Sequence, residues 1–412
     1  MAKITEFSET KVIKTTHECD VLVAGGGVAG IAAALAAARS GKSVILLERG
    51  YMLGGLATAG LVTIYLALCD GMGHQVSFGL AEELLRLSIK HGAEVTLKEK
   101  TGRYPEIWLD RDATVEERAA ARRFEACFNA QLFAIDAEKQ LLSEGVKILY
   151  GAVAADVRKE DGKITHVIIE GKTSREAIEV KSVVDATGDA DVCYLAGAKC
   201  EKHGKGNILA AWYYSVSEGN YNLNSLGFCD ISEEQRKAGA TVKYLSPKRF
   251  GGVDTDEISE FMQLSHDATY TDFFAKYGDK ELSYPVTIAT VPQLRMTRRL
   301  VGAYTLDESE VHTYKEDSIG LVSDWRKRGP IFEIPFGALW GKEVKNLITA
   351  GRCISVTDAM WDITRVIPDC AVTGEAAGVA AAMSDDFTTL DVKELQAELA
   401  RRGVKLHESE VL

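Results

Sequence analysis

CDVLVAGGGVAGIAAALAAARSGKSVILLE, residues 19–48, is the stretch that decides the fold. Apolar residues run from 19 to 24, a glycine-rich turn spans 25–30, and an alanine-rich segment continues from 31 to 40. Gly41 closes that segment, and a second apolar run covers 42–48. Short apolar runs bounded by glycine predict buried strands, and the segment between them predicts a helix. The stretch therefore predicts a strand–turn–helix–strand unit of an α/β protein.

The turn carries the spacing G-x-G-x-x-G at Gly25, Gly27 and Gly30, and Glu48 ends the second strand 18 residues after Gly30. Gly25 would permit a tight turn, Gly27 would let the backbone approach a pyrophosphate, and Gly30 would let the helix pack closely on the strand. The helix N-terminus would face the phosphates, and Glu48 would accept hydrogen bonds from ribose hydroxyls. The pattern predicts a dinucleotide site, and the alternative is a glycine-rich turn that binds nothing. By itself it does not choose between NAD and FAD.

The composition is that of an ordinary globular protein, with 46% hydrophobic and 26% charged residues among 412. This length predicts two domains, or one large domain with an insertion. The net charge of −12 argues against nucleic acid and anionic membranes as main partners, because both attract basic surfaces. No apolar run reaches transmembrane length, and the first residues lack the features of a secretory signal. We therefore expect a cytoplasmic protein that acts on a small molecule.

The eight cysteines form no C-x-x-C pair, and no Cys/His spacing suits zinc. We expect reduced thiols, no metal site and no disulfide-reductase chemistry. Asp254 and Asp256 resemble a metal-binding loop only superficially, since the later glycine and glutamate are missing, and they predict a helix start. No second G-x-G-x-x-G occurs, so a separate NAD(P)H domain is not expected.

The residues after Glu48 indicate which dinucleotide binds. Arg49 follows directly, and two glycines stand at 54–55, which gives the pattern E-R-x(4)-G-G. This pattern resembles that of flavoproteins related to glutathione reductase, and residues 186–188 resemble their A-T-G motif. The resemblance implies FAD as the cofactor and places the backbone of Val153 against the adenine. The segment between the two motifs predicts a helix over 129–144, strands over 146–150, 152–157, 164–170 and 177–184, and a hairpin turn at 160–163.

Four stretches together resemble the broad FAD-dependent oxidoreductase family. They are G-G-L-A-T at 54–58, V-V-D-A-T-G-D at 183–189, N-L-I-T-A-G-R-C-I-S at 346–355 and R-V-I-P-D-C-A-V-T-G-E-A-A-G at 365–378. The resemblance covers essentially the whole chain and implies an α/β, FAD-binding Rossmann-like domain of the glutathione-reductase type, but it leaves the substrate open. The residues expected at the cofactor are Gly25, Gly27, Val28, Ala29, Gly30, Glu48, Arg49, Gly54, Gly55, Leu56, Ala57, Thr58, Val153, Ala186, Thr187, Gly188, Asp189, Gly351, Arg352, Arg365, Thr373, Gly374 and Ala377.

The stretch from Thr373 to Met383 predicts a helix with almost no side-chain bulk. Each of its two glycines, Gly374 and Gly378, costs about 0.5–1 kcal/mol relative to alanine, so their presence needs a reason. Such a helix lets a large flat group approach its backbone, and the resemblance implies that its N-terminus points at the isoalloxazine ring. The alternative is a buried helix packed tightly on a sheet.

Residues 201–335 carry no cofactor motif and interrupt the two flavin-binding segments, 1–200 and 336–412. We expect them to form an inserted α+β substrate domain that lays a sheet over the flavin. Within this segment, Arg295 could bind a substrate carboxylate through two parallel hydrogen bonds. A structural salt bridge is the alternative role for this arginine.

Three further residues are candidates for positions near the ring. His74, in a glycine-containing loop, could act as an acid or a base. Cys370 could face the flavin, and Arg365 could lie near the isoalloxazine or the pyrophosphate. The alternatives are an exposed loop histidine, a buried apolar thiol and an arginine that packs the domains together.

These features predict an FAD-dependent oxidoreductase that transfers a hydride between a small organic substrate and flavin N5. The alternatives are an oxidase or monooxygenase that uses O₂, and a flavin-binding protein without turnover. An electron-donor or electron-acceptor protein is a further partner consistent with this chemistry. The sequence does not indicate the oligomeric state.

Overall fold

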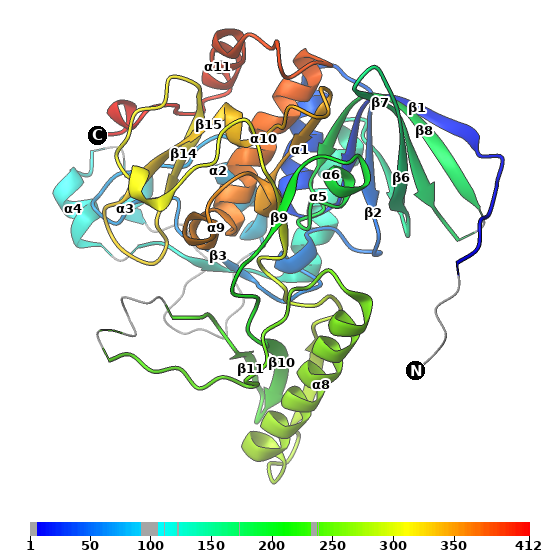
Figure 1. Cartoon of the computed structure of the whole chain (residues 1–412). Helices are drawn as coiled ribbons and strands as arrows, with labels where there is room; N and C mark the ends of the chain where they lie inside the picture. Colours follow the sequence, from blue (N-terminus) through cyan, green and yellow to red (C-terminus); the bar gives the residue numbers. More distant parts are fainter. Residues whose placement is uncertain are drawn as a thin grey trace.

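The computed structural model describes residues 6–91, 106–110, 112–121, 123–172, 174–231, 237 and 239–412. Figure 1 shows a main body built around one large sheet, from which a smaller unit of strands and one helix projects. The first five residues, where a secretory signal would begin, lie outside the described part of the chain.

A seven-stranded sheet forms the centre of the main body, in the order β5-β2-β1-β8-β7-β6, with β16 also beside β8. Its strands are β1 (Lys14–Ala24), β2 (Val44–Glu48), β5 (Lys147–Tyr150), β6 (Val153–Glu160), β7 (Lys163–Glu170), β8 (Arg175–Asp185) and β16 (Leu347–Thr349). Strands β5, β2, β1, β8 and β16 pair in parallel, whereas β6, β7 and β8 form an antiparallel meander. Each strand predicted from the sequence forms, and the predicted hairpin turn joins β6 to β7.

Both faces of the parallel strands are buried, which explains their nearly continuous apolar sequences. Val21 and Val23 of β1 pack into a core that includes α1 (Val28–Arg39) and α10 (Ile367–Met383). The alternate residues, Leu22 and Ala24, pack into a second core with residues of β7 and β8. The carboxyl ends of β1 and β8 therefore meet at one edge of a rigid sheet, as the dinucleotide turn requires.

Several further helices belong to the main body. They are α2 (Leu80–Ser88), α3 (Glu106–Leu109), α4 (Val115–Ala120), α5 (Ala130–Ser143), α6 (Asp191–Leu195), α9 (Asp358–Thr364) and α11 (Val392–Arg401). Short 3₁₀ helices occupy Gly55–Ala57, Glu308–Glu310, Phe336–Ala338, Gly351–Cys353 and Glu408–Glu410. The body also contains the strand pairs β3 (Ile64–Tyr65) with β4 (Ala126–Cys127) and β14 (Ser318–Ser323) with β15 (Ile331–Pro335).

The helix predicted to begin at Thr373 begins six residues earlier, at Ile367, with Val366 as its N-cap. Pro368 lies in the first turn, where its missing N–H group has no intrahelical partner to lose and its fixed φ suits a helix. The prediction of the N-terminus was therefore wrong. The small residues on which that expectation was based therefore lie beyond the first turn of α10.

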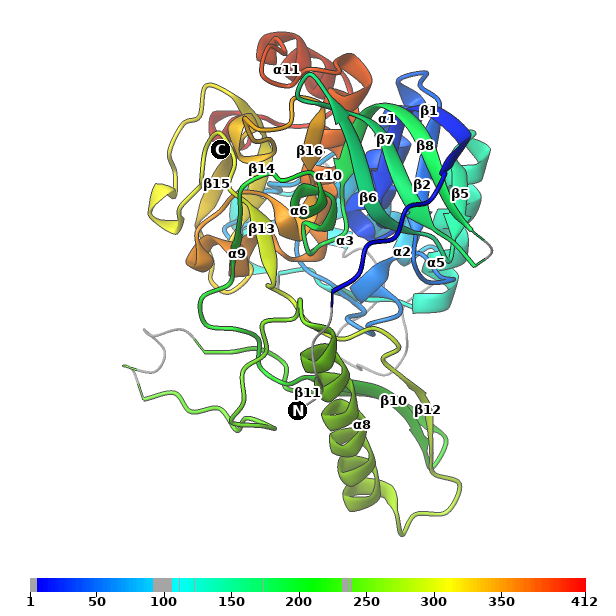
Figure 2. The same cartoon turned by 45° about the vertical axis from the view of Figure 1, so that its right-hand side comes forward.

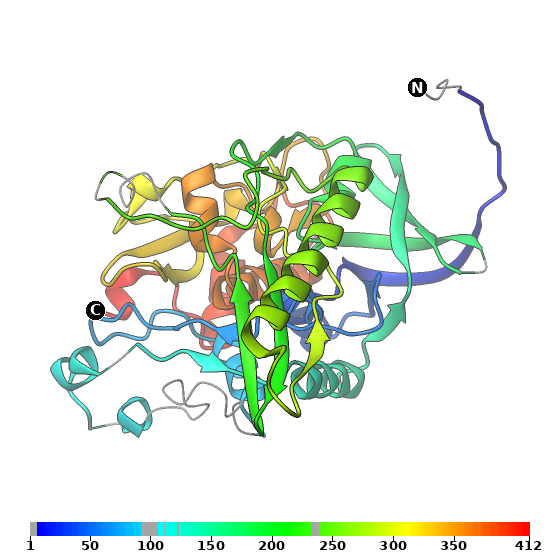
Figure 3. The ribbon, with the colours of Figure 1, turned by 90° about the horizontal axis from the view of Figure 1, so that it is seen from below.

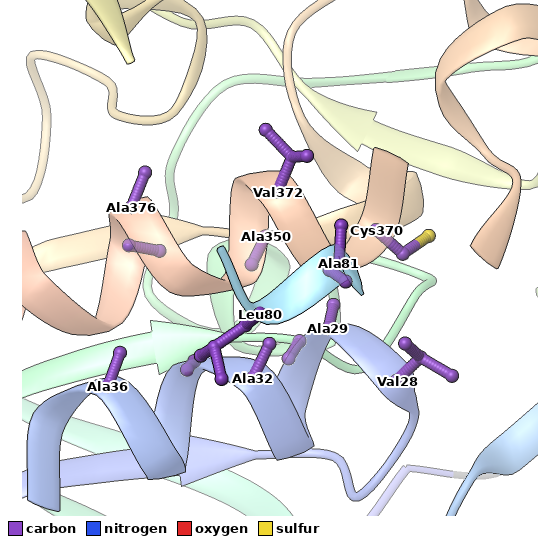
Figure 4. Close-up of a cluster of buried hydrophobic side chains, with 14 of the residues drawn as sticks. Val28, Ala29, Ala32, Ala36, Leu80, Ala81, Ala350, Cys370, Val372 and Ala376 are labelled. Carbon is purple, nitrogen blue, oxygen red and sulfur yellow. The ribbon is translucent and has the colours of Figure 1, made fainter. Parts of the chain in front are cut away.

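The small residues of α10 pack against α1, not against a flat ligand. A Cβ added at Gly374 would lie 2.3 Å from the carbonyl oxygen of Ala29, and one at Gly378 would lie 2.2 Å from that of Ala33. Figure 4 shows the two helices side by side, with Ala29, Ala32 and Ala36 of α1 turned toward α10. Glycine and alanine on both helices let the two backbones approach this closely, which is why α10 carries so little bulk.

The projecting unit consists of the sheet β11-β10-β12 and the helix α8, as Figures 2 and 3 show from two sides. Its elements are β10 (Ala211–Ser217), β11 (Asn220–Leu226), α8 (Thr255–Tyr277) and β12 (Tyr284–Ile288). The predicted helix start is confirmed, because the Asp254 carboxylate caps α8 by accepting from the N–H of Glu257 at 3.0 Å.

Some strands within the range expected for the insertion, 201–335, lie in the main body. Strand β13 (Arg298–Leu300) returns to pair with β9 (Cys200–Lys202), and residues of β14 and β15 such as Ile319 and Phe332 belong to the main core. Residues from about 203 to 297 therefore make up the projecting unit and its connections. The β14–β15 hairpin belongs to the main body because its apolar face packs on α10 and α11.

Among the described residues, no single helix is long and apolar enough to cross a bilayer. The pair α9 and α10 passes the same test together, but the two helices are bent by 92° and α10 lies within the protein core.

Candidate functional site

A single cavity of about 1090 Å³ runs from the glycine turn after β1 to the projecting unit. Most of the residues predicted at the cofactor line it: Gly25, Gly27, Val28, Ala29, Glu48, Arg49, Gly54, Gly55, Leu56, Ala57, Val153, Ala186, Thr187, Gly188, Asp189, Gly351, Arg352 and Arg365. Arg295 and Cys370 line it too. His74, Gly30, Thr58, Thr373, Gly374 and Ala377 do not.

Each of the three glycines of the turn is required for a different geometric reason. Gly25 has φ of +103°, and a Cβ there would lie 2.5 Å from the carbonyl oxygen of Ala186. A Cβ at Gly30 would lie 1.8 Å from the carbonyl oxygen of Gly25, so Gly30 permits close packing and does not itself reach the cavity. At Gly27, the N-cap of α1, a Cβ would meet no protein atom within 4 Å and would project into open space. The Gly27 backbone therefore forms an open cradle at a helix N-terminus, where phosphates bind.

The Glu48 carboxylate holds the two loops that flank this cradle. Its oxygens accept hydrogen bonds from the N–H of Gly26 at 3.0 Å and from the N–H of Gly50 at 2.6 Å. The residue is only 9% exposed but lines the cavity. An ionised carboxylate has about four acceptor positions, so two remain for the ribose hydroxyls that the sequence predicted.

Residues 53–58 form an arch over the glycine turn. The N–H of Gly54 donates to the carbonyl of Gly26 at 2.7 Å, and the φ of Gly54 is +99°. Thr58 was expected at the cofactor, but its hydroxyl donates to the carbonyl of Leu53 at 2.5 Å and its side chain is fully buried. Thr58 therefore closes the arch from within and does not contact the cavity.

The turn after β8 is held by Asp185, a residue for which the sequence analysis proposed no role. One carboxylate oxygen accepts from the N–H and the hydroxyl of Thr187 at 3.1 and 2.7 Å, and the other accepts from the N–H of Cys193 at 2.9 Å. Gly188 follows with φ of +82°. A buried carboxylate with three donors fixes the A-T-G turn beside the glycine turn of β1.

Two of the predicted candidates do not line the cavity. His74 bonds through Nδ1 to Asp70 at 3.0 Å, outside the cavity, so this histidine stabilises its own loop. Thr373 accepts from the N–H of Gly351 at 2.9 Å and donates to the carbonyl of Asp369, inside the α10 packing.

Cys370 lines the cavity but is a neutral thiol. Burial raises its pKa to about 12, although Arg352 opposes the rise. A thiol with this pKa is not an activated nucleophile at neutral pH. Its packing therefore suits an apolar wall.

The far end of the cavity contains aromatic residues and arginines. Trp212 and Phe228, from β10 and the segment after β11, stack with ring centroids 5.5 Å apart and planes 9° apart. Arg295 lies over the Trp212 ring at 5.6 Å and is 9% exposed. Trp325, which the sequence analysis missed, also lines this end. It comes from the loop between β14 and β15, and no motif marked it.

The other arginines of this end are paired. Arg365 donates through Nε and Nη2 to Asp362 at 2.9 and 2.6 Å, and Arg326 forms two bonds to Asp324 at 3.0 and 2.9 Å. Although burial opposes it, Arg365 and Arg326 hold the pKa of Asp362 below its usual value. These pairs leave little uncompensated charge on Arg365 and Arg326.

A glycine cradle at the N-terminus of α1, an acidic residue ending β2 and a fixed A-T-G turn define a dinucleotide-binding α/β protein. A family model described as FAD dependent oxidoreductase matches residues 20–211 and 210–399. The chain belongs to this family, and its cofactor is FAD.

Curated relatives match parts of the chain. It is 31% identical over 186 residues to thiamine thiazole synthase from Methanococcus vannielii. This match covers 42% of this chain and 58% of that protein. It is 34% identical over 85 residues to thioredoxin reductase from Ureaplasma parvum, which covers 20% of this chain and 28% of that protein. Among solved structures, a geranylgeranyl bacteriochlorophyll reductase-like protein from Thermoplasma acidophilum has a TM-score of 0.48 at 13% identity, with 94% of this chain and 84% of that chain covered.

Proposed function

We propose that the protein transfers a hydride between a small organic substrate and N5 of FAD. The observation that carries this proposal is the continuity of the cavity, which joins the open backbone at Gly27 to the aromatic end at Trp212 without a break. One end suits a dinucleotide, and the other suits a compact ligand that is mostly apolar. When bound, FAD supplies the two-electron redox chemistry, and the protein supplies orientation and electrostatics.

The chain holds the two ends of the cavity in a fixed relation. The N–H of Thr290 donates to the carbonyl of Ala59 at 2.8 Å, and the Gln293 amide donates to the carbonyl of Gly60 at 2.5 Å. The Thr297 hydroxyl donates to the Asp189 carboxylate at 2.6 Å. These bonds tie the segment after β12 to the flavin-binding body on both sides of the cavity.

This attachment gives the projecting unit a mechanistic role. It forms a preassembled wall of Trp212, Phe228 and Leu294 that excludes water and orients the substrate. A fixed wall of this kind lowers the entropic cost of bringing a substrate to the reacting position. On this proposal, variants of the wall change substrate reduction of the flavin and leave FAD binding intact.

The test is anaerobic bleaching of the bound flavin, followed at its visible absorption bands, against alcohols, amines, sugars and hydroxy acids. Bleaching by one class, with the matching oxidised product, supports the proposal. Flavin that a substrate does not reduce but that turns over with NADPH and O₂ to a hydroxylated product indicates a monooxygenase and contradicts it. Bound flavin that no compound reduces, and that dithionite reduces normally, indicates a flavin-binding protein without turnover.

A further inference from the structure

Arg295 presents one edge of its guanidinium without a protein partner. Nη1 donates to the carbonyl oxygen of Phe228, whereas Nε and Nη2 have no hydrogen-bond partner within the described residues. Nε and Nη2 belong to the same side of the guanidinium, and their N–H bonds point the same way. This is the edge that binds a carboxylate through two parallel hydrogen bonds.

The backbone under Arg295 is fixed. The side-chain oxygen of Asn207 accepts from the N–H of Arg295 at 2.9 Å and from the N–H of Met296 at 3.0 Å. The amide nitrogen of Asn207 donates to the carbonyls of Met296 and Phe250 at 2.6 and 3.1 Å. Asn207 is 5% exposed, so this clamp is part of the core of the unit. Arg295 is therefore held in place as a lining residue of the cavity, and its unpartnered Nε and Nη2 atoms are buried within that wall.

The charge on Arg295 is not balanced by the protein. Burial and the nearby Arg365 lower its pKa to about 9, although Cys229 and Asp362 oppose the shift. Asp362 is already engaged by Arg365 and Arg326, and Asp189 of the cavity wall lies 3.8 Å from Arg352. A buried cation without a partner is unfavourable, and an anion that enters the cavity would recover part of that free energy.

We propose that the Nε–Nη2 edge of Arg295 binds the carboxylate of a flat organic acid, whose apolar body lies against the aromatic side chains of the same end. The walls there are Trp212, Phe228 and Trp325, which suit an aromatic ring better than a sugar or a polyol. The proposal names the substrate class of the site and rests on the proposed function only in calling that acid a substrate.

Equilibrium binding to the oxidised, FAD-loaded protein tests this site without turnover. The probes are benzoate and its neutral isostere benzamide, measured by calorimetry and by the change in the flavin absorption spectrum. Benzoate should bind, and benzamide should bind at least tenfold more weakly. Arg295→Met should weaken benzoate at least tenfold, leave benzamide unchanged and retain FAD, while Arg295→Lys should give an intermediate benzoate affinity because it keeps the charge without the parallel edge.

Arg249→Met is the matched control. Arg249 lies in the same unit and pairs with Asp230 at 2.6 Å, but it does not line the cavity. The Arg249→Met variant should bind benzoate with the affinity of the native protein. No benzoate binding to the native protein, equal affinity for benzoate and benzamide, or unchanged benzoate affinity in both Arg295 variants would overturn the proposal. Loss of FAD from both variants would also overturn it, since it would assign the unpartnered edge to the cofactor.

The result of this binding test can be distinguished from the result of the bleaching test of the proposed function. If benzoate binds through Arg295 but no carboxylic acid reduces or oxidises the flavin, the reaction is wrong and the site stands. If an uncharged alcohol bleaches the flavin and benzoate does not bind, the reaction stands and the site is wrong.

Discussion

Glu375 gives a prediction whose size follows from the structure. Its carboxyl group is 3% exposed in the middle of α10 and accepts from the N–H of Leu80 at 2.7 Å, so it supplies the N-terminal cap that Gly79 cannot give to α2. Burial raises its pKa from 4.5 to about 7, although the bond from Leu80 opposes the rise. Charging this group in the folded protein is therefore unfavourable.

The direction of the effect of pH on stability follows from the linkage between proton binding and folding. Because the pKa of Glu375 is higher in the folded than in the unfolded state, the folded state binds the proton more tightly. The associated stability is fully present below about pH 4.5 and is lost as the pH rises to about 7. Raising the pKa from 4.5 to about 7 corresponds to at most about 3–4 kcal/mol, since a pKa difference of one is about 1.4 kcal/mol.

The perturbation is Glu375→Gln, which stays neutral and keeps an oxygen for the N–H of Leu80. Relative to the native protein, the free energy of unfolding of the variant should rise by about 2–3 kcal/mol between pH 5 and pH 8. Urea unfolding of the FAD-loaded proteins at the two pH values measures this difference. Glu316→Gln is the control, because the Glu316 side chain is 82% exposed. A difference between variant and native protein that stays the same at both pH values would refute the reasoning.

Two further predictions concern the packing of α10. Gly378→Ala should destabilise the protein by about 1–3 kcal/mol in urea unfolding, because its Cβ would lie 2.2 Å from the carbonyl oxygen of Ala33. A gain of about 1 kcal/mol, as expected for an exposed helix glycine, would contradict this packing. Cys370 should resist alkylation by iodoacetamide at pH 8 in the folded protein, because burial raises its thiol pKa to about 12. Mass spectrometry would detect the label, and rapid modification of Cys370 without unfolding would be the contrary result.

The sequence predicted the strands of the main sheet and the glycine turn because their signals are local. Apolar runs and glycine spacing near residues 19–48 determine the βαβ unit without help from distant residues. The start of α10 was not predictable in this way, because Pro368 reads as a break in sequence but is favourable in a first turn. The reason for a glycine at position 374 was also not predictable from the sequence, because only the fold shows that α1 packs against this residue.

The substrate end was predictable only in part. Arg295 stood out as an arginine in a segment without cofactor motifs, but its unpartnered edge depends on Asn207 and Phe228, which are 88 and 67 residues away in sequence. Trp325 and Arg326 belong to a loop whose approach to the cavity is set by the β14–β15 hairpin. Contacts of this kind have no sequence period, so pattern analysis does not find them.

The flavin content of Gly27→Val tests the central claim, that FAD binds with its pyrophosphate at the backbone of Gly27. Gly27 has φ −68° and ψ 180°, which valine adopts easily, and a Cβ there meets no protein atom within 4 Å. The variant should therefore fold, with a circular dichroism spectrum and a urea midpoint close to those of native apoprotein, but contain no FAD. Gly171→Val is the control and should retain FAD, because Gly171 lies outside the cavity and its added Cβ would be in ordinary contact, at 3.7 Å, with the carbonyl oxygen of Ser174. Full FAD occupancy in Gly27→Val would contradict the account.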